Sequence, residues 1–229
     1  MKTIIITGAG GNLGVATVRQ FLESGYRVIG LESHPKSPDF AGYGEHFVFK
    51  QVDLTNEKET ADLVRGLIVK YGRIDGAILL VGGFASGNLE ATGGADIDRM
   101  FSLNFKTAYF TARPLIGHLK ENKYGRLVFI GARPALEASQ GKELVAYALT
   151  KSLLFKLADF INEDAKHENI VASVVVPSTL DTTLNRQSMP GVNPADWVKP
   201  QQLAEVLEFL FSEKGSALRE TVLKVYNNA

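Results

Sequence analysis

The sequence predicts an α/β protein with an open, doubly wound, parallel sheet of about seven strands flanked by helices. Short apolar runs alternate with amphipathic stretches of 12 residues or more, which is the pattern of βαβ units. The runs are almost continuously apolar, as in strands covered on both faces, and a glycine-rich turn follows the first of them. No repeat, linker or low-complexity segment divides residues 1–229, so we expect a single domain.

Composition narrows the functional classes. Of the 229 residues, 45% are hydrophobic, and 25 basic residues balance 25 acidic ones, so we expect neither nucleic acid nor a membrane surface as a partner. The absence of cysteine excludes disulfides and thiolate chemistry. The four histidines lack ligand spacing, so no metal site is expected. No signal peptide or span of roughly 20 apolar residues is recognisable, and we expect a cytoplasmic protein.

Seven short apolar runs are expected to be strands. They are Thr3–Thr7, Arg27–Leu31, Phe47–Val52, Ala77–Val81, Leu127–Ile130, Ile170–Val176 and Thr221–Val225. Five amphipathic stretches between them are expected to be helices. They are Leu13–Glu23, Asn56–Tyr71, Asp96–Asn122, Leu144–Lys166 and Gln201–Ser212.

Local signals refine four of these helices. Asn56 and Glu59 have the spacing of a reciprocal capping pair, and Pro114 is expected to end or kink the third helix. Pro200 suits the first turn of the last helix. An apolar stripe runs along the fourth helix, formed by Leu149, Leu153, Leu157, Phe160 and Ile161.

The turn after the first strand reads TGAGGNLG, residues 7–14. Glycines let the backbone approach a pyrophosphate, and the N–H groups at the start of the following helix attract the anion. We therefore expect a dinucleotide cradle, the alternative being a tight turn with a structural role alone. The cradle residues are Gly8, Gly10, Gly11, Asn12, Leu13 and Gly14.

The ends of the next two strands should decide which nucleotide binds. Glu32 can accept hydrogen bonds from both ribose hydroxyls and would repel a 2′-phosphate, which favours NAD(H). His34 and Lys36 lie nearby, so NADP(H) remains the alternative, with Glu32 merely solvated. Asp53 and Leu54 are expected at the adenine edge, and capping of the next helix is the structural role open to Asp53.

Two irregular stretches, Gly82–Gly94 and Pro177–Pro200, follow strand ends, where open α/β sheets bind ligands. Long loops in such positions are more often lids than filler. The cofactor contacts that we expect in them are Gly82, Gly83, Pro177 and Thr179.

The segment VAYALTK places Tyr147 and Lys151 one helical turn apart, on the same face. In isolation they would be an ordinary surface pair. Behind a nucleotide cradle they are expected to be a proton-donating pair, because an ammonium lowers the pKa of a nearby phenol from about 10 towards the working range.

Three motifs together, TGAGGNLG, Asn104 in SLNFKT and Tyr147-x-x-x-Lys151, resemble the short-chain dehydrogenase/reductase family over essentially the whole chain. The resemblance implies a Rossmann-type fold in which Tyr147 is the acid/base and Lys151 holds the nicotinamide ribose. It also implies that Asn104 supports a proton relay through water. A homodimer or homotetramer through the helices at 96–122 and 144–166 is implied too, although their apolar residues would equally serve a monomeric core.

One expected residue of the family is absent. The serine that follows the fifth strand is replaced in FIGARPAL, where its positions fall on Gly131 and Ala132, and Ser139 lies nearby. The segments AILLVGGFASGN, FIGARPAL, AYALTK and VVPSTLDTTLNRQSMP are similar to the dihydropteridine reductase branch, which manages without this serine. Asn104, however, belongs to the broader family pattern. The branch implies reduction of a quinonoid dihydropteridine to the tetrahydropteridine with NADH.

A substrate of this kind suits the residues, because reduction at a conjugated C=N develops no localised alkoxide that a serine would stabilise. Phe84 and Trp197 are expected to flank the flat ring, with Met189 in the same site, and plain packing under a lid is the alternative for the two aromatic residues. Two other functions stay open. One is reduction of another small carbonyl or cyclic imine, and the other is a non-catalytic NAD(P)-sensing protein.

Overall fold

The computed structural model describes residues 1–228 and contains one sheet of seven parallel strands. The strand order is β3-β2-β1-β4-β5-β6-β7. Their bounds are β1 Thr3–Thr7, β2 Arg27–Glu32, β3 Phe47–Gln51, β4 Gly76–Leu79, β5 Tyr124–Ile130, β6 Asn169–Pro177 and β7 Val222–Val225. The order reverses between β1 and β4, and a crevice for a ligand forms at such a switch point. The fold class predicted from the sequence is confirmed.

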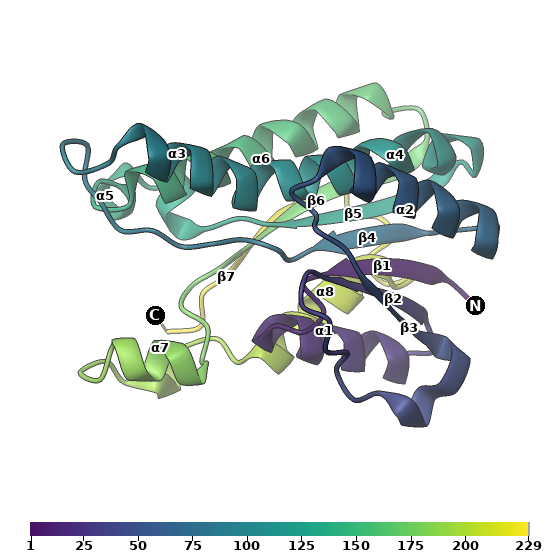
Figure 1. Ribbon diagram of the computed structural model, residues 1–229, viewed down its shortest axis with the longest axis horizontal. Helices are drawn as coiled ribbons and strands as arrows, with labels where there is room; N and C mark the ends of the chain where they lie inside the picture. Colours follow the sequence, from purple (N-terminus) through teal and green to yellow (C-terminus); the bar gives the residue numbers. More distant parts are fainter. Residues whose placement is uncertain (229) are drawn as a thin grey trace.

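Helices cover both faces of the sheet (Figure 1). The helices α1 Asn12–Glu23 and α8 Pro200–Phe211 lie on one face, and α2 Glu57–Tyr71, α4 Thr107–Glu121 and α6 Val145–Asp164 lie on the other. The shorter helices are α3 Gly94–Phe101, α5 Ala138–Gly141 and α7 Thr183–Ser188, with the 3₁₀ turns η1 Ala41–His46, η3 Arg133–Ala135 and η4 Pro194–Asp196.

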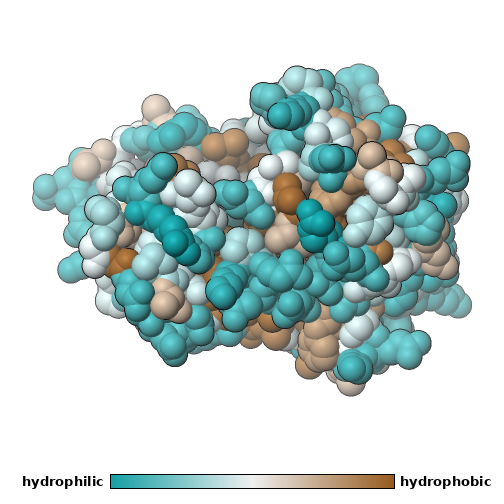
Figure 2. All heavy atoms as spheres, turned by 90° about the horizontal axis from the view of Figure 1, so that it is seen from below, coloured by the Kyte–Doolittle hydropathy of each residue, from teal (hydrophilic) through white to brown (hydrophobic). Residues whose placement is uncertain are grey.

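Two hydrophobic cores explain why the strands read as continuous apolar runs. Ile4 and Ile6 pack under α1 and α8, whereas Ile5 packs under α2, α4 and α6, and all three side chains are fully buried. Side chains of a strand point alternately to the two faces of a sheet, and here both faces are covered. Burial of each such side chain contributes about 1.5–3 kcal/mol. Figure 2, viewed from below, shows a mostly hydrophilic outer surface with scattered hydrophobic patches.

Of the two hydrogen bonds predicted for the capping pair at the start of α2, one is present and the other is not. The Asn56 Oδ1 accepts a hydrogen bond from the Glu59 backbone N–H at 3.2 Å. The Glu59 carboxylate does not return to the Asn56 N–H but accepts from the Asp53 N–H at 3.4 Å. The Asn56 N–H instead donates to the Asp53 carbonyl. Its hydrogen bond is therefore formed within the turn before the helix, and the Glu59 carboxylate is not needed as an acceptor.

Pro114 does not end its helix, because it lies inside α4; a kink at Pro114, the other expected outcome, stays a prediction. The long helical stretch is instead interrupted earlier, by the single π turn η2 Ser102–Lys106. A proline inside a helix costs about 3 kcal/mol, and α4 offsets that cost by burying an apolar stripe against the sheet. The stripe comprises Ala108, Ala112, Leu115 and Leu119.

The apolar stripe predicted on α6 largely faces outward. Leu149, Leu153 and Phe160 are 56%, 38% and 65% exposed, whereas the sheet is contacted by Leu154 and Ala158. These three side chains therefore do not pack in the core of the chain. Packing in a monomeric core, the alternative to a subunit interface, does not account for them.

Two negative findings concern the described residues 1–228. None of their helices is both long and apolar enough to cross a membrane. No group of three or more histidine, aspartate or glutamate side chains among them is placed to bind a metal ion.

Candidate active site

The turn between β1 and α1 requires glycine at two positions. Gly8 has φ of 67°, a left-handed conformation that side chains disfavour. A Cβ on Gly14 would lie 1.9 Å from the Gly8 carbonyl oxygen, so α1 packs on the turn too closely for any other residue. The turn thus brings bare backbone to the carboxyl edge of the sheet.

The start of α1 has no side chain over its free N–H groups. Gly11 is the N-cap residue and no side chain caps the helix. The first N–H groups of a helix attract anions when nothing else satisfies them. The cradle therefore fits a dinucleotide diphosphate, with Gly10, Asn12 and Leu13 beside it.

Glu32 is held against the cradle. Its Oε2 accepts from the Gly10 N–H at 3.0 Å, and its Oε1 accepts from the Ser33 N–H at 2.9 Å. These bonds fix the carboxylate at the end of β2, which is where a ribose of the dinucleotide would lie. Glu32 is therefore not simply solvated.

Asp53 and Leu54 have different surroundings. The Asp53 Oδ1 accepts from the N–H and the hydroxyl of Thr55 at 2.9 and 2.7 Å. Asn56, not Asp53, caps α2. The helix-capping role expected for Asp53 is therefore not found, and its side chain instead stabilises the turn that precedes the helix. Leu54 is 4% exposed and packs in the core. An adenine contact by either residue stays a prediction.

Lys151 reaches from α6 towards the end of β5. Its side chain is buried, and its Nζ donates to the Ile130 carbonyl at 2.8 Å. Burial lowers the pKa of Lys151 to about 8. The group is therefore mainly an ammonium at neutral pH, but it loses its proton more easily than an exposed lysine.

Tyr147 lies one turn before Lys151 on α6. Burial raises its pKa to about 12. The expected lowering of this pKa by the Lys151 ammonium is therefore not found in the free protein, where removal of water from the phenol is the cause of the shift. At neutral pH the Tyr147 hydroxyl keeps its proton, which suits a proton donor.

Asn104 connects two parts of the site. It lies in the π turn η2 and is fully buried. Its Oδ1 accepts from the Gly83 N–H at 2.7 Å, and its Nδ2 donates to the Thr150 Oγ1 at 3.1 Å. The side chain thus ties the loop after β4 to α6, beside Lys151. π turns of this kind are frequent at functional sites.

The two glycines after β4 leave space for these side chains. A Cβ on Gly82 would lie 2.8 Å from the Asn104 Oδ1 and 3.1 Å from the Lys151 Nζ. A Cβ on Gly83 would lie 2.8 Å from Leu103. Gly82 and Gly83 therefore border the predicted catalytic residues Asn104 and Lys151, and their contact with the cofactor stays a prediction.

The residues assigned to the substrate do not share one environment. The Phe84 ring is 64% exposed and lies edge-on to the Tyr147 ring, with centroids 5.2 Å apart. The Trp197 ring is 2% exposed, which fits a side chain that packs in the protein interior and does not flank a substrate. Met189 lies at the end of α7, and Pro177 and Thr179 lie where β6 ends.

Among the residues described at the end of β5, none carries a hydroxyl at the two positions expected for the serine. A side chain on Gly131 would lie 2.8 Å from Val174 and 2.9 Å from Phe155, so that position is closed. Ala132 is buried just after β5. Ser139 is exposed on α5 and forms no hydrogen bond among the described residues.

Two supporting residues escaped sequence analysis. The Thr7 Oγ1 accepts from the Leu80 and Val81 N–H groups at 3.0 and 3.4 Å and joins β1 to β4 at the switch point. Thr150 holds Asn104. Thr7 could have been found as a polar residue at the carboxyl end of a buried strand, but Thr150 looks like any polar residue of a helix.

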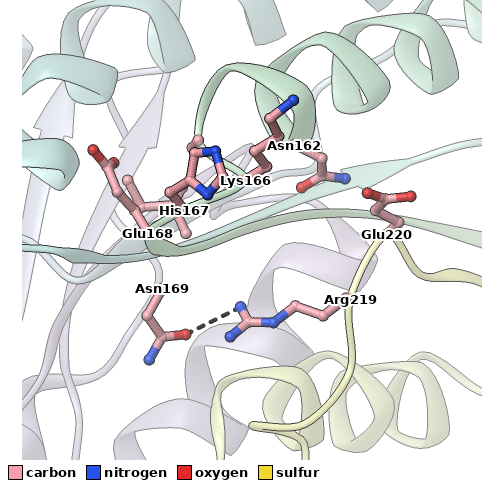
Figure 3. A pocket seen from close by; sticks show the side chains of 9 residues that line it. Asn162, Lys166, His167, Glu168, Asn169, Arg219 and Glu220 are labelled. Atoms are coloured by element: carbon pink, nitrogen blue, oxygen red, sulfur yellow. Dashed lines mark hydrogen bonds between the residues drawn. The ribbon is translucent and has the colours of Figure 1, made fainter.

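A cavity of about 390 Å³ lies elsewhere. It is at the amino ends of β6 and β7, where Figure 3 shows His167 and Glu220 at its border and Arg219 bonded to Asn169. The glycine turn and Tyr147 are at the opposite edge of the sheet. The candidate active site is therefore identified by the glycine turn and the Tyr147–Lys151 pair, and this cavity is not part of it.

Comparisons with known proteins agree with this geometry. A model described as short chain dehydrogenase matches residues 2–193. Dihydropteridine reductase of Dictyostelium discoideum is 27% identical, over 90% of this chain and 86% of its own. Short-chain dehydrogenase/reductase olcF of Penicillium canescens is 24% identical, over 98% and 95%. The solved structure of ElxO with NADP bound has a TM-score of 0.90 at 22% identity, covering 98% of this chain and 96% of that chain. The chain belongs to the short-chain dehydrogenase family of NAD(P)-dependent oxidoreductases.

Proposed function

We propose that the protein reduces a quinonoid dihydropteridine to the tetrahydropteridine with NADH. The observation that carries the proposal is the apolar end of β5, where Ala132 takes the place of a hydrogen-bonding hydroxyl and Ser139 is turned to solvent. A ketone needs such a donor when its oxygen becomes an alkoxide. A C=N bond in a conjugated ring does not develop that charge.

The other side of the site suits a flat ring. Phe84 offers an exposed aromatic face next to Tyr147, and aromatic rings stack on planar heterocycles. Similarity to the dihydropteridine reductase of Dictyostelium discoideum supports the same substrate class.

Each residue then has a defined task. When bound, the dinucleotide supplies the hydride. The Tyr147 hydroxyl, protonated at neutral pH, donates the accompanying proton to the substrate. In this proposal, Lys151 binds the nicotinamide ribose through its ammonium. Asn104 holds the loop at Gly83 against α6 and supports the return of a proton from water.

NADH is the proposed cofactor because of the position of Glu32. Its carboxylate is already directed to the cradle by two backbone N–H groups, and a 2′-phosphate there would meet a like charge. The structural relative ElxO binds NADP, so NADPH is the competing cofactor for this chain.

A homodimer or homotetramer is proposed as the assembly. The rings of Phe101, Phe105 and Tyr109 stack in series on α3, η2 and α4, with centroids 5.2 and 5.8 Å apart, and α6 adds exposed Leu149 and Phe160. Apolar patches of this kind mark association surfaces. The cytoplasmic location stays a prediction.

Steady-state oxidation of NADH tests the substrate. Freshly generated quinonoid dihydropterin is compared with a panel of small ketones and cyclic imines under identical conditions. We expect turnover with the pterin alone. Turnover of ketones but not of the pterin would instead favour a reductase of another small carbonyl or cyclic imine. Tight NADH binding with no turnover of any substrate would favour a non-catalytic NAD(P)-sensing protein.

A further inference from the structure

The segment 178–198, here named the α7 lid, leaves the sheet after β6 and returns to α8. Figure 1 shows α7 projecting from the carboxyl edge, away from the helices of both layers. Hydrogen bonds within the lid connect α7 to the residues before it: Arg186 pairs with Asp181 at 2.6 and 2.8 Å, and the Asn185 side chain donates to the Leu180 carbonyl at 2.8 Å. Among the described residues, α7 forms hydrogen bonds only within the lid.

The two limbs of the lid are joined at its base. The Val198 N–H donates to the Thr179 carbonyl at 3.0 Å, and the Asp181 N–H donates to the Val198 carbonyl at 2.8 Å. The outgoing and returning limbs therefore move together, and the orientation of α7 depends on how this base is attached to the sheet.

Residues after β7 supply that attachment. On the outgoing limb, the Ser178 hydroxyl donates to the Tyr226 carbonyl at 2.6 Å. On the returning limb, the Asn227 Nδ2 donates to the Trp197 carbonyl at 3.1 Å and to the Ala195 carbonyl at 3.5 Å. The Trp197 side chain on the same limb is buried.

The backbone of Asn227 is adapted to this contact. Its φ is 52°, in the left-handed region that asparagine adopts more readily than most residues. The turn that this conformation makes brings the amide onto the lid. Neighbouring Asn228 is exposed, and its side chain forms no hydrogen bond among the described residues.

We propose that Asn227 is a positioning residue, which clamps the base of the α7 lid and so sets how the lid covers the substrate. The substrate part of this inference rests on the proposed function, whereas the clamp itself does not. Met189 and Thr179 are carried by the same lid, so a loosened base displaces both from the site.

The test uses Asn227→Asp and Asn227→Gly in the full chain. The aspartate keeps the shape and tolerates the left-handed backbone, but it cannot donate and places a charge against two carbonyl oxygens. The glycine keeps the backbone conformation and removes the side chain. Asn228→Asp is the matched control, because it adds the same charge one residue away.

Hydrogen–deuterium exchange of the lid amides is measured first, without substrate. We expect exchange at residues 181–196 to accelerate by roughly threefold to tenfold in both Asn227 variants, the range for losing one or two hydrogen bonds. The control should match the wild type. Unchanged exchange in both Asn227 variants would overturn the clamp, whatever the enzyme reduces.

Kinetics with the accepted substrate form the second measurement. The Asn227 variants should raise its KM more than they lower kcat, while the Kd of NADH measured without substrate stays within about twofold. Equal losses in NADH binding and in substrate KM would show a general structural defect and contradict a positioning role. Absence of turnover in the wild type would count against the proposed function but would leave the exchange result standing.

Discussion

The two edges of the sheet are both rich in polar side chains, but they use them differently. At the amino edge, the Tyr124 ring lies within 4.9–5.8 Å of the cationic groups of Lys2, Arg73 and Arg126, and Arg126 donates to two backbone carbonyls at 2.8 and 2.9 Å. These donors hold the loops of the chain itself. At the carboxyl edge, no side chain caps the start of α1, and among the cradle N–H groups that the structure describes only that of Gly10 is bonded to a side chain, the Glu32 carboxylate.

The cavity at the amino edge is lined by the segments that precede β6 and β7 and holds none of the predicted site residues. The carboxyl edge instead gathers a titratable pair with shifted pKa values, Tyr147 and Lys151, next to a place for an anion. Shifted pKa values in a ligand crevice indicate a functional site. Substitutions at the two edges should therefore have very different consequences.

Tyr147→Phe should have the largest effect. It removes the phenolic proton and keeps the ring that packs on Phe84. Turnover should fall by roughly 10² or more, the scale of a lost general acid. The Kd of NADH, measured by its fluorescence, should change little. A variant with the wild-type rate would remove Tyr147 from the mechanism.

The pH profile should reveal Lys151. Burial lowers its pKa to about 8, so the ammonium is present below that pH and lost above it. We expect kcat/KM, which reports groups of the free enzyme, to fall by about tenfold per pH unit above pH 8. The melting temperature over the same range is the control for unfolding. A flat profile up to pH 10 would contradict an essential ammonium.

Glu32→Ala should weaken NADH binding by about tenfold, since a hydrogen bond to a charged group is worth about 1.5–3 kcal/mol. The preference for NADH over NADPH should narrow, because the negative charge beside the ribose is gone. Glu32→Gln separates the two causes, as it keeps an acceptor without the charge. Undiminished NADH preference in both variants would refute the ribose contact.

Arg219→Ala, at the amino edge, should have the smallest effect. The side chain is exposed and donates to the Asn169 Oδ1 at 3.2 Å. We expect kcat/KM within twofold of the wild type and a change in unfolding free energy within about 0.5 kcal/mol. A large kinetic loss would mean that the two edges are coupled.

Much of the fold was readable from local pattern. All seven strands were located, and β1 was bounded to the residue, because a strand buried on both faces is an uninterrupted apolar run. The predictions were wrong where the local structure depends on contacts with distant segments of the chain. The π turn at Asn104 and the continuation of α4 through Pro114 depend on packing against the sheet and α6, which no local pattern encodes.

Local sequence patterns were sufficient to predict the order of strands and helices along the chain, the glycine-rich turn after β1 and the one-turn spacing of Tyr147 and Lys151. Contacts between distant segments set the pKa values of this pair, the link from Asn104 to Thr150, the burial of Trp197 and the outward direction of Leu149 and Phe160. Backbone geometry and helical spacing are local properties of the chain. Desolvation and exposure are set by atoms that the fold brings in from distant parts of the chain.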